Sequence, residues 1–222
     1  SPSSSSRAAR PASDSVVVNK STVPDGSARV VAAELRRDDV SVVSNPEFLR
    51  EGSAVADFLN PDRVVIGSDD RAAAMATAEL YSSLNAPIMI TDPASAETIK
   101  YASNAFLATK LSFINAVAAV CEAVGADVAD VVTGMGYDTR IGREFLRPGP
   151  GWGGSCFPKD TLAMVRIAAD AGYDFGLLKG VVEVNDQQFD RVVDKIRRGV
   201  AGPLEGATVA LWGLTFKART DD

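Results

Sequence analysis

A glycine-rich stretch that ends in a cysteine is the part of the sequence best suited to chemistry. It covers residues 149–160 and reads GPGWGGSCFPKD. Pro158 then opens an apolar pattern typical of a helix, and proline is tolerated in a first helical turn because its missing N–H has no partner to lose there. Cys156 is therefore predicted at a helix N-terminus. Exposed N–H groups and the helix dipole favour a thiolate there, which is the nucleophilic form of cysteine.

The residues around Cys156 leave two interpretations open. The glycines leave room for a ligand against the backbone, and Lys159 and Asp160 add a cation and a carboxylate within one turn. An inert cysteine beside a glycine loop that caps a helix is the common alternative. The chain contains no histidine, so acid–base work would depend on Lys, Asp, Glu and Cys.

Two further pairs of polar residues are spaced four apart. Residues 45–52 are predicted as a short helical turn, capped by Asn45, in which Glu47 and Glu51 share a face. Solvated carboxylates are the usual explanation of such a pair. The functional one is a carboxylate pair at a cleft beyond the preceding strand. Lys100 and Asn104 share a face near the start of a long helix, where a solvated helix edge is the alternative.

Composition limits the possible functions. The chain has 222 residues, of which 46% are apolar and 23% charged, and a net charge of −6. We expect one to two globular domains and no nucleic-acid partner, because the charge is negative. We also expect no membrane partner, since no apolar run approaches the ~20 residues that span a bilayer. Two cysteines do not suggest a disulfide framework, which favours a reducing compartment such as the cytoplasm.

The elements that would position these residues alternate between strands and helices in the first part of the chain. This alternation predicts a mainly parallel α/β sheet, followed by a helical middle. The long helix is of the kind that bridges domains or forms a dimer interface. Strands are predicted at 16–18, 40–43, 64–67, 87–91 and 208–214, and helices at 27–36, 71–84, 94–124, 127–133, from Pro158 to about Ala168, and at 175–198.

Several expected nucleotide-binding features are missing from the sequence. The runs nearest to a GxGxxG dinucleotide fingerprint, at 134–139 and 149–154, neither follow a strand nor open a helix in a βαβ unit. There is no Walker A sequence and no cluster of metal ligands. Residues 1–15 are rich in Ser, Ala, Arg and Pro and are predicted to be a disordered or non-native tail. Both ends of the chain look cut.

Six motifs follow one another along the chain. They are NKSTVP (19–24), PEFLREG (46–52), ETIKYASNAFLATKLSFIN (97–115), RIGREFL (140–146), GWGGSCFPKD (151–160) and GLTFKARTDD (213–222). In this order they resemble the UDP-glucose 6-dehydrogenase branch of the UDP-glucose/GDP-mannose dehydrogenase family. The resemblance implies the remainder of a Rossmann-like NAD-binding domain (16–92), a helical central dimerisation domain with one long helix (93–202) and the first strand of a second Rossmann-like, UDP-binding domain (203–222).

The resemblance also implies a reaction. UDP-glucose would be oxidised twice at C6 by NAD, through a thiohemiacetal and a thioester on cysteine, to give UDP-glucuronate. Cys156 would be the nucleophile, and Lys100 would stabilise oxyanion character at C6. Asn104 and Asp160 would hold the water and the lysine. Glu47 would act as a base in thioester hydrolysis.

Further residues acquire ligand-binding roles from the same resemblance, and no metal is expected. Thr22 and Glu51 would lie near the nicotinamide end of NAD, and Lys159 is a further candidate for cofactor binding. Arg140 would reach the substrate of a neighbouring subunit, because the family dimerises through its middle domain. The candidate substrate-binding residues are Phe48, Leu49, Lys100, Asn104, Arg140, Phe145, Leu146, Gly149, Gly153, Phe216 and Lys217.

Two alternatives stay open from the sequence. The first is a sister enzyme that acts on GDP-mannose or a UDP-N-acetylhexosamine. The second is a non-catalytic remnant that serves as an oligomerisation module. Because the fingerprint half of the NAD domain and most of the UDP-binding domain are missing, we expect this chain by itself to bind NAD poorly.

Overall fold

The computed structural model divides into two compact units, residues 1–100 and 101–222. The structure describes all residues except 1–11, 13, 25, 201, 219 and 221–222, so most of the tail predicted at 1–15 lies outside the described residues. Each unit is described by itself. The four domain segments expected from the sequence stay predictions.

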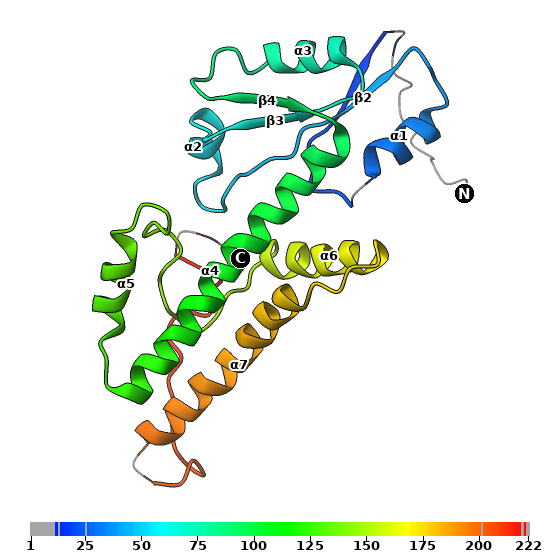
Figure 1. The fold of residues 1–222 in the computed structure, drawn as a ribbon. Helices are drawn as coiled ribbons and strands as arrows, with labels where there is room; N and C mark the ends of the chain where they lie inside the picture. The colour runs from blue at the N-terminus through cyan, green and yellow to red at the C-terminus, as the bar shows by residue number, and fades with distance from the viewer. Residues whose placement is uncertain (1–11, 13, 25, 201, 219, 221–222) are drawn as a thin grey trace, which may run out of the picture. The chain divides into compact units, whose positions relative to one another are not determined.

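The first unit is built on a four-stranded sheet with the strand order β1-β2-β3-β4 (Figure 1). The β1–β2 and β3–β4 pairs are parallel, whereas β2 and β3 meet antiparallel at Ser44 and Gly67. The predicted mainly parallel α/β sheet is therefore confirmed, with one antiparallel pairing. The elements are β1 (Val16–Asn19), α1 (Ser27–Leu35), β2 (Ser41–Ser44), α2 (Ala54–Leu59), β3 (Val64–Gly67), α3 (Arg71–Glu79) and β4 (Ile88–Thr91).

The core of this unit lies between the sheet and α3. Val43 and Ile66 are fully buried and pack with Ala73, Ala74 and Tyr81. Helix α3 ends about one turn before the predicted residue 84. Its continuation tightens into i→i−3 hydrogen bonds at residues 80–82, the pattern with which many helices end.

The predicted helical turn at residues 45–52 is wrong. Residues 45–50 have no helical structure, and α2 begins only at Ala54. Asn45 does not cap a helix. It is buried, and its amide donates to the Val65 carbonyl oxygen at 2.7 Å and accepts from the Tyr81 hydroxyl. Bonds to two distant segments thus outweigh the local capping signal, and the premise that Glu47 and Glu51 share a helical face is lost.

Helix α4 (Pro93–Val124) confirms the long helix expected from the sequence. The Asp92 carboxylate accepts from the Ser95 backbone N–H at its start, and Gly125 ends it with φ 76°. The second unit continues with α5 (Val128–Gly136), α6 (Phe157–Asp170) and α7 (Gly176–Gly199).

Helix α7 runs alongside α4 (Figure 1). The Ser112 hydroxyl of α4 donates to the Val181 carbonyl oxygen at 2.7 Å, and Lys195 pairs with Glu122. Their shared core contains Ala105, Ala108, Trp152, Leu178 and Val181. Cys121 is buried and not in a disulfide, as expected for a core residue.

By length and composition alone, α4 could cross a membrane, the one such helix among the described residues. The sequence-based expectation that no apolar run is long enough is therefore wrong. Core helices of globular proteins pass the same test, and Ser112 and Asn115 of α4 are buried and bonded to protein groups. The outer face of α4 within the second unit is apolar and exposed at Phe106, Phe113, Val120 and Val124.

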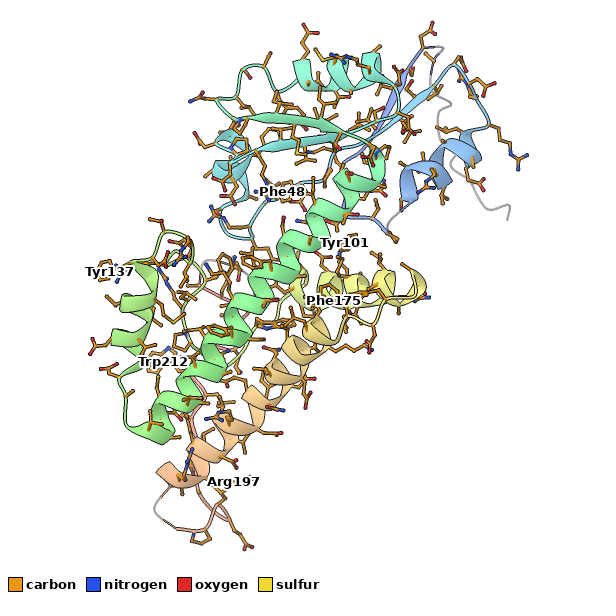
Figure 2. The ribbon with its side chains drawn as sticks, viewed as in Figure 1. Phe48, Tyr101, Tyr137, Phe175, Arg197 and Trp212 are labelled. Carbon is orange, nitrogen blue, oxygen red and sulfur yellow. The ribbon has the colours of Figure 1, made fainter. Side chains whose placement is uncertain are left out.

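The strand predicted at residues 208–214 does not form. These residues have no regular structure, and the side chains of Leu211, Trp212 and Leu214 are exposed. Trp212 is labelled in Figure 2. A strand needs a neighbour to accept and supply its backbone hydrogen bonds. The described residues of the second unit contain no other strand that could do so.

Candidate active site

Cys156 lies where the sequence predicted it, at the N-cap of α6 with Pro158 in the first turn. Its carbonyl oxygen accepts from the Asp160 N–H at 2.9 Å, which closes that turn. The Cys156 side chain is exposed, and its sulfur lies 3.6 Å from the Ser155 hydroxyl oxygen. An accessible thiol at a helix N-terminus can serve as a nucleophile.

A buried carboxylate follows in the first turn of α6. Asp160 is 1% exposed, and its Oδ2 accepts from the Asn104 side-chain amide of α4 at 2.6 Å. Its Oδ1 has no hydrogen bond among the described residues, and the Lys159 ammonium lies 3.8 Å from it. Because a buried acceptor without a hydrogen bond is unfavourable, Oδ1 is a natural acceptor for a water or a ligand group. The structure thus brings Asn104 and Asp160 together.

A side chain of α7 fixes Trp152 in the glycine loop before Cys156. Asn185 is buried, and its amide oxygen accepts from the Trp152 N–H at 2.7 Å. Its amide nitrogen donates to the Trp152 carbonyl oxygen at 3.0 Å. The Trp152 indole N–H donates to the Ser112 hydroxyl at 2.9 Å, so the loop is also attached to α4.

The start of the same loop is held in a similar way. The Gly149 N–H donates to the Asn115 side-chain oxygen at 2.8 Å, and the Gln188 amide donates to the Gly149 carbonyl oxygen at 2.6 Å. Helices α4 and α7 therefore each supply a polar side chain to both ends of residues 149–152. This leaves the loop geometry determined by the helices rather than by the glycines alone.

The C-terminal segment lies against the end of the glycine loop. A Cβ added at Gly154, where φ is +80°, would lie 2.5 Å from the Phe216 ring. The Lys217 ammonium is 5.4 Å from the centroid of that ring. Gly153, in contrast, has open space around its Cα. Phe216 is thus in contact with Gly154, which lies two residues before Cys156.

The residues expected to wrap a substrate are placed differently from one another. Phe145 has φ 64°, and its ring centroid is 6.3 Å from that of Phe157. Leu146 is buried, so its side chain serves the core. Arg140 is exposed and forms a bidentate pair with Asp138, whose pKa is held below its usual value by the hydrogen bonds from the guanidinium.

The first unit contains the other candidate group, around Lys100. Lys100 is 4% exposed, and its ammonium lies 3.6 Å from Glu47 Oε1 and 5.3 Å from the centroid of the Phe48 ring. The Arg63 guanidinium stacks on the same ring at 3.9 Å. Glu47 is itself held, because its Oε2 accepts from the Leu49 N–H at 2.6 Å. One carboxylate and one aromatic face thus stabilise the buried ammonium.

Comparison with known proteins identifies the family of the chain. The model of the UDP-glucose/GDP-mannose dehydrogenase family, central domain, matches residues 94–187, and that of the NAD binding domain of the same family matches residues 6–85. The chain belongs to the UDP-glucose/GDP-mannose dehydrogenase family. The resemblance seen in the sequence motifs is confirmed.

Relatives of known structure or curated function extend this result. UDP-glucose 6-dehydrogenase TuaD of Bacillus subtilis (strain 168) is 52% identical over 212 residues, which are 93% of this chain and 46% of that protein. The structure of a UDP-glucose dehydrogenase from Pyrobaculum islandicum matches with a TM-score of 0.74 and 46% identity over 78% of this chain and 42% of that one. A UDP-D-ManNAc dehydrogenase from Pyrococcus horikoshii matches with a TM-score of 0.75 and 25% identity over 86% and 45%. The chain spans about half the length of the curated relatives it matches.

The first unit of this dehydrogenase-family chain fits a nucleotide cofactor at one edge of its sheet. Strands β1 and β2 are parallel, so their carboxyl ends lie at the same edge. Ligands of open α/β sheets bind beyond such ends. The segments that leave β1 and β2 contain Thr22 and Glu51, both half-buried. Lys159, the third candidate for cofactor binding, belongs to the second unit and is largely exposed.

Sequence reasoning missed the residues that hold the loop. No function was predicted for Asn185, Ser112, Asn115 or Gln188, although Ser112 and Asn115 lie in the motif at 97–115. A usable signal exists in the helix pattern. Polar residues that recur among apolar ones on the inner face of a long helix must find partners there.

Proposed function

We propose that this chain is part of an NAD-dependent dehydrogenase that oxidises UDP-glucose at C6, in two steps, to UDP-glucuronate. The observation that supports this most is the exposed Cys156 at the start of α6, one turn before the buried Asp160–Asn104 pair. The identity to a relative named UDP-glucose 6-dehydrogenase, 52%, exceeds the 25% to the UDP-D-ManNAc dehydrogenase. That difference favours UDP-glucose over a UDP-N-acetylhexosamine.

The proposed chemistry passes through covalent intermediates on cysteine. Loss of a hydride and a proton from the C6 alcohol gives an aldehyde, and the Cys156 thiolate adds to it to form a thiohemiacetal. Loss of a second hydride and proton gives a thioester. Water then displaces the thiolate, which leaves the carboxylate and regenerates Cys156. NAD, when bound, supplies the hydride acceptor for both oxidations.

The polar residues have separate roles in this scheme. Lys100 stabilises negative charge on the C6 oxygen, for which its buried ammonium is suited. Glu47 accepts a proton from the hydrolytic water. Asp160, with its free Oδ1, and Asn104 hold a water. Thr22, Glu51 and Lys159 are assigned to NAD.

The sugar nucleotide is assigned to the remaining candidates. These come from the segment after β2, from the glycine loop and the residues before it, and from the C-terminal segment. We place the reaction in the cytoplasm, where cysteine thiols such as Cys156 stay reduced. The residues are Phe48, Leu49, Arg140, Phe145, Leu146, Gly149, Gly153, Phe216 and Lys217.

The test is the stoichiometry of NADH. A full-length version of the protein incubated with NAD and UDP-glucose should form two NADH per sugar, and Cys156→Ser in it should stop the second oxidation. Cys121→Ser is the matched control, because Cys121 is buried in the helical core. Full four-electron turnover by Cys156→Ser would refute the role of that cysteine. A substrate panel tests the choice of sugar nucleotide. If GDP-mannose or a UDP-N-acetylhexosamine is turned over faster than UDP-glucose, that compound is the substrate instead.

We also propose that the protein is a homodimer and that the exposed apolar face of α4 forms its interface. Its exposed residues Phe106, Phe113 and Val120 recur every seven positions, the spacing with which one helix packs along another. A dimer in sedimentation that is lost in Phe113→Glu supports this. A monomeric wild-type protein contradicts it. The non-catalytic alternative predicts a dimer that binds neither UDP-glucose nor NAD in calorimetry.

A further inference from the structure

A buried carboxylate near the start of α4 has no part in the scheme above. Glu97 is 3% exposed and lies one turn before Lys100. Burial of an ionised carboxylate is strongly unfavourable unless hydrogen bonds compensate it. The residues that supply those bonds therefore indicate what Glu97 does.

Three neutral donors from two separate segments bind Glu97. Its Oε2 accepts from the Gly26 N–H at 2.7 Å. Its Oε1 accepts from the Ala28 N–H at 3.2 Å and from the Ser44 hydroxyl at 2.8 Å. Gly26 and Ala28 belong to the start of α1, and Ser44 is the last residue of β2.

The bonds to Gly26 and Ala28 complete the N-terminus of α1. The N-cap residue is Gly26, which has no side chain with which to accept from the first N–H groups. The Ser27 N–H is taken by the Pro24 carbonyl oxygen at 3.1 Å, and Glu97 takes the next one. A carboxylate at this position also interacts favourably with the helix dipole. The α1 N-terminus is consequently filled and is not a phosphate site.

The two segments that Glu97 holds are those that contain candidate site residues. Thr22 lies four residues before Gly26, in the loop from β1 to α1. Glu47 lies three residues after Ser44. We propose that Glu97 is a positioning residue that holds the segments of Thr22 and Glu47 in fixed register with Lys100 on its own helix. The functional part of this proposal rests on the proposed function, because the roles of those three residues come from it.

Hydrogen exchange tests the positioning directly and without turnover. In Glu97→Gln one amide oxygen faces three donors, so the peptides covering 19–28 and 44–49 should both exchange about tenfold faster. Strand β3 and helix α3 should not change. The matched control is Glu34→Gln, which alters an exposed carboxylate on α1. Faster exchange near residues 26–28 alone, or in neither segment, would overturn the proposal.

A second variant covers the case in which Glu97→Gln does not fold. Ser44→Ala removes one of the three bonds and leaves the α1 cap in place, so only the peptide 44–49 should exchange faster. No change in that peptide would contradict the tether to β2. Glu97→Asp keeps the charge but is one methylene shorter, so it should fall between the wild type and Glu97→Gln in exchange at both segments.

Kinetics separates positioning from plain loss of stability. Partial unfolding lowers kcat by removing active protein and leaves KM unchanged, whereas a displaced Thr22 loop raises the KM for NAD. We expect Glu97→Gln to raise that KM and lower kcat several-fold each, with partial recovery in Glu97→Asp. An unchanged KM would overturn the positioning role. If the wild type does not oxidise UDP-glucose, the proposed function fails, while the exchange result still decides whether Glu97 couples the two segments.

Discussion

The side-chain amide of Asn185 forms hydrogen bonds with both backbone polar groups of Trp152, accepting at 2.7 Å and donating at 3.0 Å. The amide thus satisfies both the N–H and the C=O of one residue, as the backbone of a neighbouring strand does in a β-sheet. Trp152 lies four residues before Cys156, and its indole is fixed by Ser112. The position of the nucleophile therefore depends on a residue 33 positions after Trp152 in the chain.

Asn185→Ala should loosen the glycine loop. The substitution leaves a buried N–H and a buried C=O without partners, each of which is unfavourable by about 1–3 kcal/mol. We expect a loss of roughly 2–4 kcal/mol in the free energy of unfolding of the second unit. In a Trp212→Phe background, the emission of Trp152 should shift to the red. Gln187→Ala, an exposed amide on the same helix, should change neither quantity.

Gly154→Ala should displace the C-terminal segment, while Gly153→Ala should not. At Gly154 the new Cβ meets the Phe216 ring at 2.5 Å and φ is +80°, whereas nothing lies within 4 Å at Gly153. We expect residues 203–220 to become more sensitive to limited proteolysis in Gly154→Ala, with a destabilisation of about 1–2 kcal/mol from the backbone alone. Equal sensitivity of the two variants would show that the Phe216 contact is not formed in solution.

Asn104→Asp should make the protein unstable in a pH-dependent way. The new carboxylate would lie beside Asp160, and two carboxylates at that separation cannot both ionise. The pKa of this new carboxylate would be raised in the folded state. The loss in the free energy of unfolding, about 2–4 kcal/mol, should therefore be largest above that pKa and should shrink as the pH falls through it. Urea unfolding at neutral and mildly acidic pH measures this. The double variant Asn104→Asp, Asp160→Asn exchanges the partners and should recover most of the stability.

Asp57 should make the first unit sensitive to acid. The hydrogen bonds from the Arg50 guanidinium hold the pKa of Asp57 well below its usual range, against the opposing effect of burial. A depressed pKa adds stability above the unfolded value of about 3.9. That contribution is lost as the pH falls through the folded value. Asp57→Asn should weaken the dependence of unfolding on pH below about 5, and Asp69→Asn, at an exposed site, should leave it unchanged.

Local signals in the sequence predicted most helices and the sheet. The helix predicted from Asp127 begins at Val128, with Asp127 as the N-cap that accepts from the Ala129 N–H. Pro158 lies in the first turn of α6, as the sequence indicated. Such caps involve residues a few positions apart, so the sequence contains both partners. The same holds for Cys156, whose place at the start of α6 follows from its neighbours alone.

Features that depend on distant partners could not be predicted in the same way. Asn45 has the local properties of a helix cap, yet its side chain bonds to Val65 and Tyr81, and residues 45–50 form no helix. The apolar run at 208–214 has the composition of a strand, but the described part of the second unit contains no strand with which it could pair. The contact between Asn104 and Asp160, 56 positions apart, was not predicted. The family resemblance implied only that both residues would hold the water and the lysine.

The spacing between Glu97 and Lys100 has a consequence for insertions and deletions. Both residues are fixed on one rigid helix, so a residue inserted between them would rotate the lysine by about 100° around the helix axis. The same insertion in a surface loop would cost little, because the free energy of closing a loop rises only slowly with its length. In this unit, the tolerance of the chain to length changes should therefore be lowest within a single turn of α4, where no loop exists to compensate.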